Sequence, residues 1–263
     1  MSDRPGFPTS IGTSNTASIT LLGHDLAGEL MGKVGFAELA YWLMTLRRPT
    51  PGELRVFETV LVTLADHGFT PTAIAARLTY VSAPEALQGA VAAGLLGGGS
   101  RFLGVTEDVG RFLAAALREA QQQPQSDAEF DELARAAVTR CRDEKRLVPG
   151  LGHPVHKDGD PRTPVLIRIA TEAGQHGPHL RLFEAIGRVH PEILGRTLPL
   201  NGAGVCGAAL ADAGLPPEML RGVALLARTA GLLGHLAEEM RRPVARAIYD
   251  AVDRNVDYIA PEG

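Results

Sequence analysis

Residues 147–162 read LVPGLGHPVHKDGDPR, and the rest of the chain is best interpreted around this stretch. Two glycines and two prolines in its first half exclude a regular helix, because glycine is costly there and proline lacks a backbone N–H. Glycine also lets backbone N–H groups approach a ligand closely. His153 ends this part, and the cations Lys157 and Arg162 follow it. The stretch predicts a binding loop with a titratable ring; the alternative is a plain connector between helices.

Asp160 and Pro161 predict that a helix begins near Arg162, because proline suits the first helical position. A guanidinium beside the positive end of a helix can hold an anion. This place is therefore a candidate anion site.

The composition is that of an ordinary soluble globular protein. The chain has 263 residues, of which 45% are apolar and 21% charged, and a net charge of −4 argues against a general nucleic-acid binder. Cys141 and Cys206 fit a reducing compartment and lack metal-ligand spacing. No signal peptide pattern opens the chain, and the longest nearly apolar run, residues 89–99, is too short to span a bilayer. We expect a cytoplasmic protein that binds neither nucleic acid nor membranes.

The remaining sequence predicts an all-α fold of about ten helices. Apolar residues recur at helical spacing from Phe36 to Leu46, and Thr50-Pro51 then joins a capping residue to a proline at the first helical position. Similar helix starts are expected at residues 70–71, 83–84, 163–164 and 216–218, a capping box at Ser126 and Glu129, and helix ends at Gly68, Gly177 and Gly214. No hairpin signal and no sustained alternation of apolar and polar residues occur.

Several polar or glycine-rich positions have both a structural and a functional interpretation. His67 either caps the last carbonyls of the helix before it or belongs to a site. The glycine-rich residues 94–104 lack the ending of a P-loop and serve either close helix packing or a ligand. Asn201 fits a helix N-cap. Arg228 interrupts an apolar run, so it is expected to face a carboxylate ligand or an acidic partner, since an unpaired buried charge is costly.

A further group of histidines gives no metal signal. His176, His179 and His190 lie in a segment rich in glycine and proline, without an i, i+4 pair on a clear helix. No metal site is expected there.

Taken together, these segments resemble the citrate synthase superfamily and, within it, the citryl-CoA lyase branch that includes the C-terminal module of ATP-citrate lyase. The matching segments, in chain order, are ADHG (65–68), GSRF (99–102), VPGLGH (148–153), DPR (160–162) and ARTAGLLGH (227–235). GSRF is similar to the GDRF of the lyase branch, where synthases have LHGG. The similarity runs from about residue 23 to residue 261.

The resemblance implies a citrate synthase-like fold in which a large helical domain carries a smaller one that closes over substrate in a homodimer. Residues 19–153 and 237–263 would form the large domain and residues 154–236 the small one, with residues 1–18 as a flexible tail. The strongly apolar segments 87–96 and 223–236 are expected to pair across the two-fold axis.

The resemblance also implies carbon–carbon cleavage of a 3-hydroxyacyl-CoA, with citryl-CoA giving acetyl-CoA and oxaloacetate and no cofactor beyond the coenzyme A of the substrate. His153 would manage the proton of the breaking alcohol, and His67, the second catalytic residue, would help the arginines to hold the substrate carboxylates. Arg162, Arg228 and Arg101 would bind substrate carboxylates, for which arginine is well suited. The coenzyme A arm would bind at Val148, Pro149, Gly150, Leu151, Gly152 and Lys157.

One departure from the family weakens the match to this chemistry. The family's Asn-Val-Asp, whose aspartate protonates the thioester enolate, reads Asn201-Gly202-Ala203 here, and Ser100 replaces another aspartate. His156, three residues after His153, is a conceivable substitute. Two alternatives to a lyase therefore stay open: a CoA-thioester binding protein with lost or altered catalysis, and a related thioester reaction such as hydrolysis or condensation.

Overall fold

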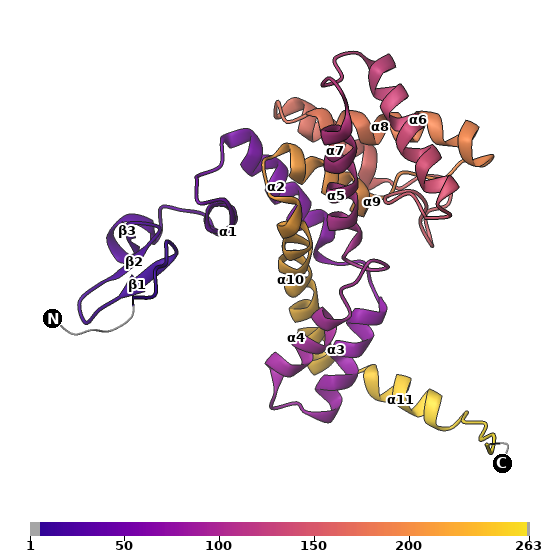
Figure 1. The fold of residues 1–263 in the computed structure, drawn as a ribbon. Coiled ribbons are helices and arrows are strands. Elements are labelled where there is room, and N and C mark those ends of the chain that lie inside the picture. The colour runs from indigo at the N-terminus through magenta and orange to yellow at the C-terminus, as the bar shows by residue number, and fades with distance from the viewer. Residues whose placement is uncertain (1–5, 262–263) are drawn as a thin grey trace.

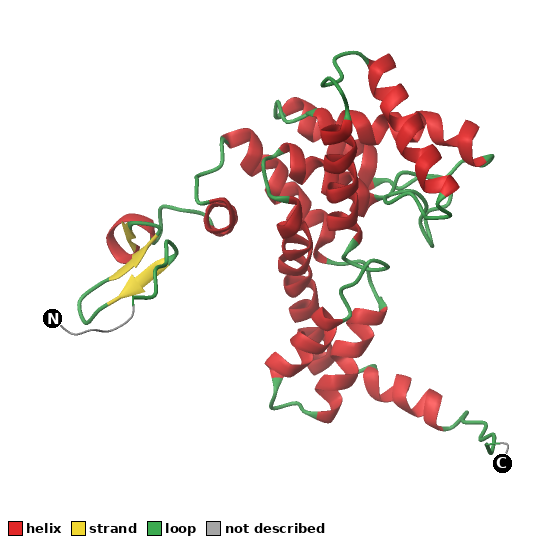
Figure 2. Cartoon of the chain, in the orientation of Figure 1, coloured by secondary structure: helices red, strands yellow, loops and turns green. Residues whose placement is uncertain are grey.

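Helices make up nearly all of the regular structure, as Figures 1 and 2 show for the computed structural model, which describes residues 6–261. The α-helices are α1 Phe36–Thr45, α2 Pro51–Ala65, α3 Pro71–Ser82, α4 Leu87–Leu96, α5 Val105–Glu119, α6 Asp127–Asp143, α7 Arg162–Glu172, α8 Pro178–Leu194, α9 Gly202–Asp212, α10 Leu220–Arg241 and α11 Ala245–Asp253. A π-helix (η1, Leu26–Leu30) and a 3-10 turn (η2, Pro217–Met219) complete them. The all-α prediction is confirmed.

A small three-stranded sheet precedes the helices and stands apart from the helical body in Figure 1. Its strands are β1 Gly12–Ser14, β2 Ile19–Leu21 and β3 His24–Asp25, paired antiparallel in that order. Residues 12–14 were expected in a flexible tail, but they form the strand β1. Strands of two or three residues are too short to show a recognisable alternation. Residues 1–5 of the expected tail lie outside the described residues.

Capping residues start the helices where the sequence indicated. At α2, Thr50 accepts a hydrogen bond from the Glu53 N–H, Glu53 accepts one from the Thr50 N–H, and Pro51 takes the first helical position. Ser126 and Glu129 form the same capping box at α6. Each such cap stabilises its helix by about 1 kcal/mol.

Two expected helix boundaries lie elsewhere. Pro84 stands in the turn after α3, and α4 begins only at Leu87. Gly177 does not end α7 but is the N-cap of α8, because Pro178 follows it at the first helical position. Gly174, with a φ of +69°, lies just after the end of α7 instead.

The core forms two clusters, and the long helix α10 takes part in both. Figure 1 shows this helix running from the region of α2 and α5 to that of α3 and α4. The larger cluster joins α1, α2, α5 to α9 and the first half of α10 around fully buried side chains such as Phe57, Phe183 and Leu220. The smaller one packs Ala73, Ala76 and Ala90 of α3 and α4 against Leu232 and Leu236 of α10. The apolar faces that suggested pairing between subunits are thus partly used within one chain.

Close helix packing explains part of the glycine-rich segment 94–104. A Cβ on Gly94 would lie 2.7 Å from Leu232 and 3.0 Å from the carbonyl oxygen of Thr72. A Cβ on Gly98 would lie 2.9 Å from Leu225. These glycines let α4 and the turn after it lie directly against α10.

The division into a large domain (19–153 and 237–263) and a small one (154–236) stays a prediction, and residues 262–263 lie outside the described range. Among residues 6–261, every helix is too short or too polar to cross a membrane.

Candidate functional site

The glycine- and proline-rich loop of residues 148–153 is fixed by hydrogen bonds against the start of α9. The Gly152 N–H donates to the carbonyl oxygen of Pro199 at 2.7 Å, and the Asn201 N–H donates to that of Gly150 at 2.9 Å. The Asn201 side chain also donates to the carbonyl oxygen of Gly152 at 2.8 Å and caps α9 by accepting from the Gly204 N–H. Gly150 and Gly152 both have φ above +80°, which glycine adopts without strain. The backbone immediately before His153 is therefore held in place.

His153 is held as a hydrogen-bond donor. Its Nδ1 accepts hydrogen bonds from the N–H groups of Val155 at 3.1 Å and His156 at 3.0 Å. The neutral ring must then carry its proton on Nε2, which is left free to donate. Burial, and then the neighbouring His156, lower the pKa of His153, so the ring is neutral near pH 7.

Three histidine rings from two loops meet at this point. The centroid of the His67 ring lies 5.5 Å from that of His153 and 5.7 Å from that of His156. The His153 and His156 centroids are 4.5 Å apart. His67 comes from the turn after α2, so the structure brings together His67 and His153, the two predicted catalytic histidines, and also His156, the conceivable substitute.

The hydrogen bonding of this cluster suits proton transfer better than metal binding. One nitrogen from each ring lies within 4.8 Å of the others. A metal-binding histidine normally donates its second N–H to a carboxylate or carbonyl. In residues 6–261 the His67 and His156 rings have no such partner, and His153 accepts rather than donates at Nδ1. A metal on Nε2 of His153 would require loss of both backbone hydrogen bonds.

Arg162 begins α7 and is gripped by Asp160. Its Nε and one terminal nitrogen donate to the two carboxylate oxygens at 2.9 and 2.8 Å, and the Gly202 N–H donates to the same carboxylate at 2.6 Å. Burial alone raises the pKa of Asp160, but these hydrogen bonds and that from the Arg162 N–H outweigh it and hold the pKa well below its usual range. A Cβ on Gly202 would lie 2.3 Å from Nε of Arg162, so a larger residue there would displace the guanidinium from Asp160.

Arg228 of α10 is a buried cation without an acidic partner. Its side chain is 5% exposed, and it donates only to the carbonyl oxygen of Leu64 at 3.3 Å and to Thr70 at 3.4 Å, while Nε has no partner in residues 6–261. Burial lowers the pKa of Arg228, and Asp66 opposes that change. A buried guanidinium without an acidic partner is a strong candidate for the binding site of an anionic ligand.

A chain of polar side chains, buried except at its exposed end Asp66, connects α3 and α10 to the turn that carries His67, and no sequence motif predicted it. Arg77 is fully buried and donates from Nε to Nδ1 of His235 at 3.0 Å and from a terminal nitrogen to Glu239 at 2.6 Å. The His235 proton must then be on Nε2, 2.9 Å from Asp66. Asp66 in turn accepts from the Gly68 N–H at 2.7 Å and fixes the turn that carries His67. The only local signal was the i, i+4 spacing of His235 and Glu239.

Close contact between α10 and the end of α2 sets the distance between these groups. A Cβ on Gly231 would lie 1.9 Å from the carbonyl oxygen of Ala65. Arg228 lies one turn before this contact on α10, and His235 lies one turn after it.

The structure does not bring every selected residue into contact with this cluster. Arg101 is exposed on the turn before α5 and forms no ion pair in residues 6–261. Lys157 is also exposed. In the loop 148–152, the N–H groups of Leu151 and Gly152 already donate within the chain.

Ala203 lies at the start of α9, partly buried against the larger core cluster. Its neighbour Gly202 contacts Arg162, and Gly204 approaches the Cα of Gly150. The position therefore lies where the Arg162 turn and the histidine loop meet, and it carries no titratable group.

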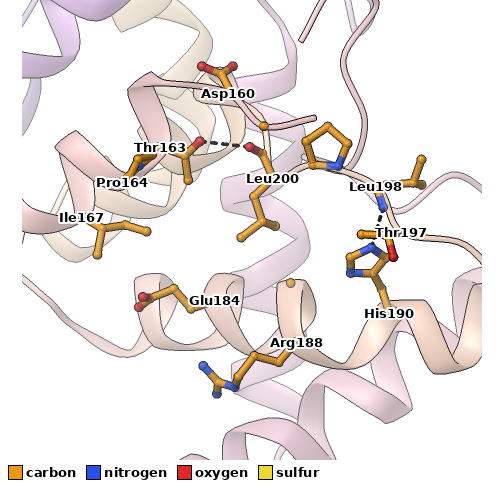
Figure 3. A pocket seen from close by; sticks show the side chains of 13 residues that line it. Asp160, Thr163, Pro164, Ile167, Glu184, Arg188, His190, Thr197, Leu198 and Leu200 are labelled. Carbon is orange, nitrogen blue, oxygen red and sulfur yellow. Dashed lines mark hydrogen bonds between the residues drawn. The ribbon is translucent and has the colours of Figure 1, made fainter. Parts of the chain in front are cut away.

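An open surface pocket of about 420 Å³ lies beside the site, between α7, α8 and residues 197–200. Figure 3 shows Asp160 and Thr163 on one side of it and Glu184, Arg188 and His190 on another. The Thr163 hydroxyl donates a hydrogen bond to the carbonyl oxygen of Leu200. The pocket shares Asp160 with the site, but the three histidines, Arg162 and Arg228 do not line it.

The fold and the site define a mainly helical protein with a cluster of three histidines and a buried arginine, Arg228, that is available to bind a carboxylate. The family model described as citrate synthase, C-terminal domain, matches residues 10–249. The chain therefore belongs to the citrate synthase family.

Individual relatives agree with this assignment. The citrate synthase of Deinococcus radiodurans is 28% identical over 209 residues, which cover 75% of this chain and 50% of that protein. The chain thus spans about half the length of the curated relatives it matches.

Solved structures extend the likeness to the whole chain. Citryl-CoA lyase from Hydrogenobacter thermophilus superimposes with a TM-score of 0.83 at 29% identity over 98% of this chain and 96% of that one. ATP citrate lyase from Methanothrix soehngenii, solved with citrate and coenzyme A, superimposes with a TM-score of 0.78 at 21% identity over 100% of this chain and 43% of that one. The predicted citrate synthase-like fold and the resemblance to the citryl-CoA lyase branch are confirmed.

Proposed function

We propose that the protein is a citryl-CoA lyase-like enzyme that cleaves a 3-hydroxyacyl-CoA, citryl-CoA or a close analogue, into acetyl-CoA and a 2-oxo acid such as oxaloacetate. The observation that carries this proposal is a neutral histidine held as an Nε2–H donor, within the same site as a buried arginine that lacks a carboxylate. Similarity to citryl-CoA lyase over nearly the whole chain supports it.

The arginines would hold the substrate acid in register. Arg228 supplies a desolvated guanidinium for one carboxylate, and the part of Arg162 that Asp160 does not occupy would meet another. His67, fixed by the Asp66 turn, would contact the same end of the substrate.

His153 would stabilise the oxygen on which charge develops. When the carbon–carbon bond breaks, the hydroxyl oxygen loses its proton and becomes the carbonyl oxygen of the product. A fixed N–H aimed at that oxygen stabilises the developing charge without reorganisation. From the sequence, His153 was expected to transfer the proton of the alcohol. The hydrogen bonds that Nδ1 of His153 accepts favour a hydrogen-bond donor role for this residue instead.

The coenzyme A part of the substrate would lie along residues 148–152, with Lys157 near a phosphate and Arg101 as an outer cation. This placement comes from the family resemblance, and the exposure of both cations is compatible with it. The reaction uses no cofactor apart from this coenzyme A.

A second candidate function is a CoA-thioester binding protein without turnover. The observation that favours it is Ala203, which leaves the start of α9 without the carboxylate of the family.

Incubation with citryl-CoA separates these possibilities. Equal formation of oxaloacetate, followed through NADH and malate dehydrogenase, and of acetyl-CoA, followed by chromatography, supports the lyase. Free CoA without oxaloacetate indicates hydrolysis, and tight binding without any product supports the binding protein. Absence of binding at millimolar citryl-CoA contradicts both.

A further inference from the structure

The proposed lyase reaction needs a group that carries a proton, and most titratable side chains of the site are unsuited to this. Asp160 is buried and fully engaged by Arg162 and Gly202. Asp66 is held by His235 and the Gly68 N–H. His153 can accept a proton only by giving up two backbone hydrogen bonds. Only His67 and His156 keep both ring nitrogens free of hydrogen bonds among the described groups of the cluster.

These two histidines come from different loops, although their ring centroids lie only 5.7 Å apart. His67 follows the end of α2, where the carbonyl of Leu64 contacts Arg228, so it lies on the side of the buried arginine. His156 follows the loop whose Gly152 carbonyl accepts a hydrogen bond from Asn201, the N-cap of the helix that carries Ala203. Its ring lies against that of His153, with 4.5 Å between centroids and a tilt of 32°.

From this placement we infer that His156 is the acid–base residue of the reaction and takes over the role that a carboxylate at the position of Ala203 would have. The inference rests on the proposed lyase function. His156 is partly buried, and its ring lies beside those of His67 and His153, so it belongs to the cluster and can still exchange protons with water.

One imidazole is enough to balance the reaction. Neutral His156 takes the hydroxyl proton, and the electron pair of that O–H bond forms the new carbonyl. The carbon–carbon bond breaks, and its electron pair passes to the thioester as an enolate. The imidazolium of His156 then returns the proton to the α-carbon, giving acetyl-CoA and a neutral ring. No net proton, electron or co-reactant is required.

The test uses the full chain, with cleavage of citryl-CoA and exchange of the acetyl-CoA methyl protons with D₂O as two readouts. His156→Ala should lower both rates by about 10²–10⁴-fold, the range for loss of an acid–base group, with little change in KM. Added imidazole should restore part of both rates, because it can enter the space left by the ring. His176→Ala is the matched control outside the site and should stay within twofold of the parent protein.

Each other outcome overturns the inference. His156→Ala that keeps its rates within tenfold, or loses them without rescue while still binding citryl-CoA, leaves no proton-carrying role for His156. Loss of exchange in His67→Ala but not in His156→Ala assigns that role to His67. In all these cases the parent protein still cleaves citryl-CoA, so the lyase function stands. If the parent neither cleaves nor exchanges, the lyase function fails and the role of His156 fails with it.

Discussion

The buried charge of Arg228 gives the most direct test at the scale of single residues. Arg228→Leu removes an unpaired buried cation, so the apo protein should unfold at the same temperature or higher. The variant should also lose stabilisation by oxaloacetate or citrate, which amounts to about 2.7 kcal/mol at 100 times Kd. Thermal unfolding with and without ligand measures both effects. Arg135→Leu, on the surface of α6, should keep the ligand effect, and an Arg228 variant that also kept it would show that this arginine is structural.

Asp160 gives a prediction about pH. Its pKa in the folded protein lies below the unfolded value of about 3.9, so its stabilising contribution is complete above about pH 4 and is lost as the pH falls through the folded pKa. Asp160→Asn should destabilise the protein by about 3 kcal/mol at pH 7, because Arg162 loses its partner.

The free energy of unfolding of Asp160→Asn should also fall less steeply than that of the parent protein between about pH 4 and pH 2. Urea titrations across this range measure the slope. Glu172→Gln, which removes two exposed ion pairs, with Arg55 and Arg168, should change the stability by less than about 1 kcal/mol. Parallel acid slopes for the parent and Asp160→Asn would contradict the assigned pKa direction.

At the scale of elements, the contact of α10 with the end of α2 determines the geometry of the site. Gly231→Ala should cost about 1–3 kcal/mol, because the new methyl group would overlap the carbonyl of Ala65. Gly234, on the same helix, has open space around it, so Gly234→Ala should be neutral or stabilising by up to about 1 kcal/mol.

Urea denaturation should compare Gly231→Ala with Gly234→Ala. Both replace glycine by alanine within α10, so the change in helix propensity is the same and any difference in stability comes from the contact with α2. Gly231→Ala should also weaken oxaloacetate binding, because Arg228 and His235 lie on either side of the contact. Equal stabilities of the two variants would mean that α10 can move away from α2 without cost.

At the scale of the whole molecule, the exposed apolar residues of both ends support the proposed homodimer. Phe7, Met31 and Phe36 near the N-terminus and Tyr258 and Ile259 near the C-terminus are all more than half exposed. Figure 1 shows both ends projecting from the helical body. Apolar surface of this kind is typical of a contact between subunits.

Light scattering at low micromolar concentration should therefore give twice 27.8 kDa. Phe36→Asp, whose side chain is 72% exposed, should weaken the association without unfolding the chain. A parent protein with the mass of a single chain would contradict the dimer.

The sequence by itself determined what depends on near neighbours along the chain. The starts of α2, α3 and α6 follow from Thr50, Thr70 and Ser126, whose side chains cap N–H groups three residues later. The loop 148–153 follows from its glycines and prolines, and collinear motifs were sufficient to identify the family.

Only the tertiary structure decided the chemistry of the individual side chains. The donor role of His153 depends on how the loop after it turns back toward the ring, and the charge of Arg228 is unpaired because of what α2 and α3 place around it. Arg77 and His235 are 158 positions apart in the chain and meet only because α3 packs on α10. Such contacts form between segments that are distant in sequence, so no local pattern of residues encodes them.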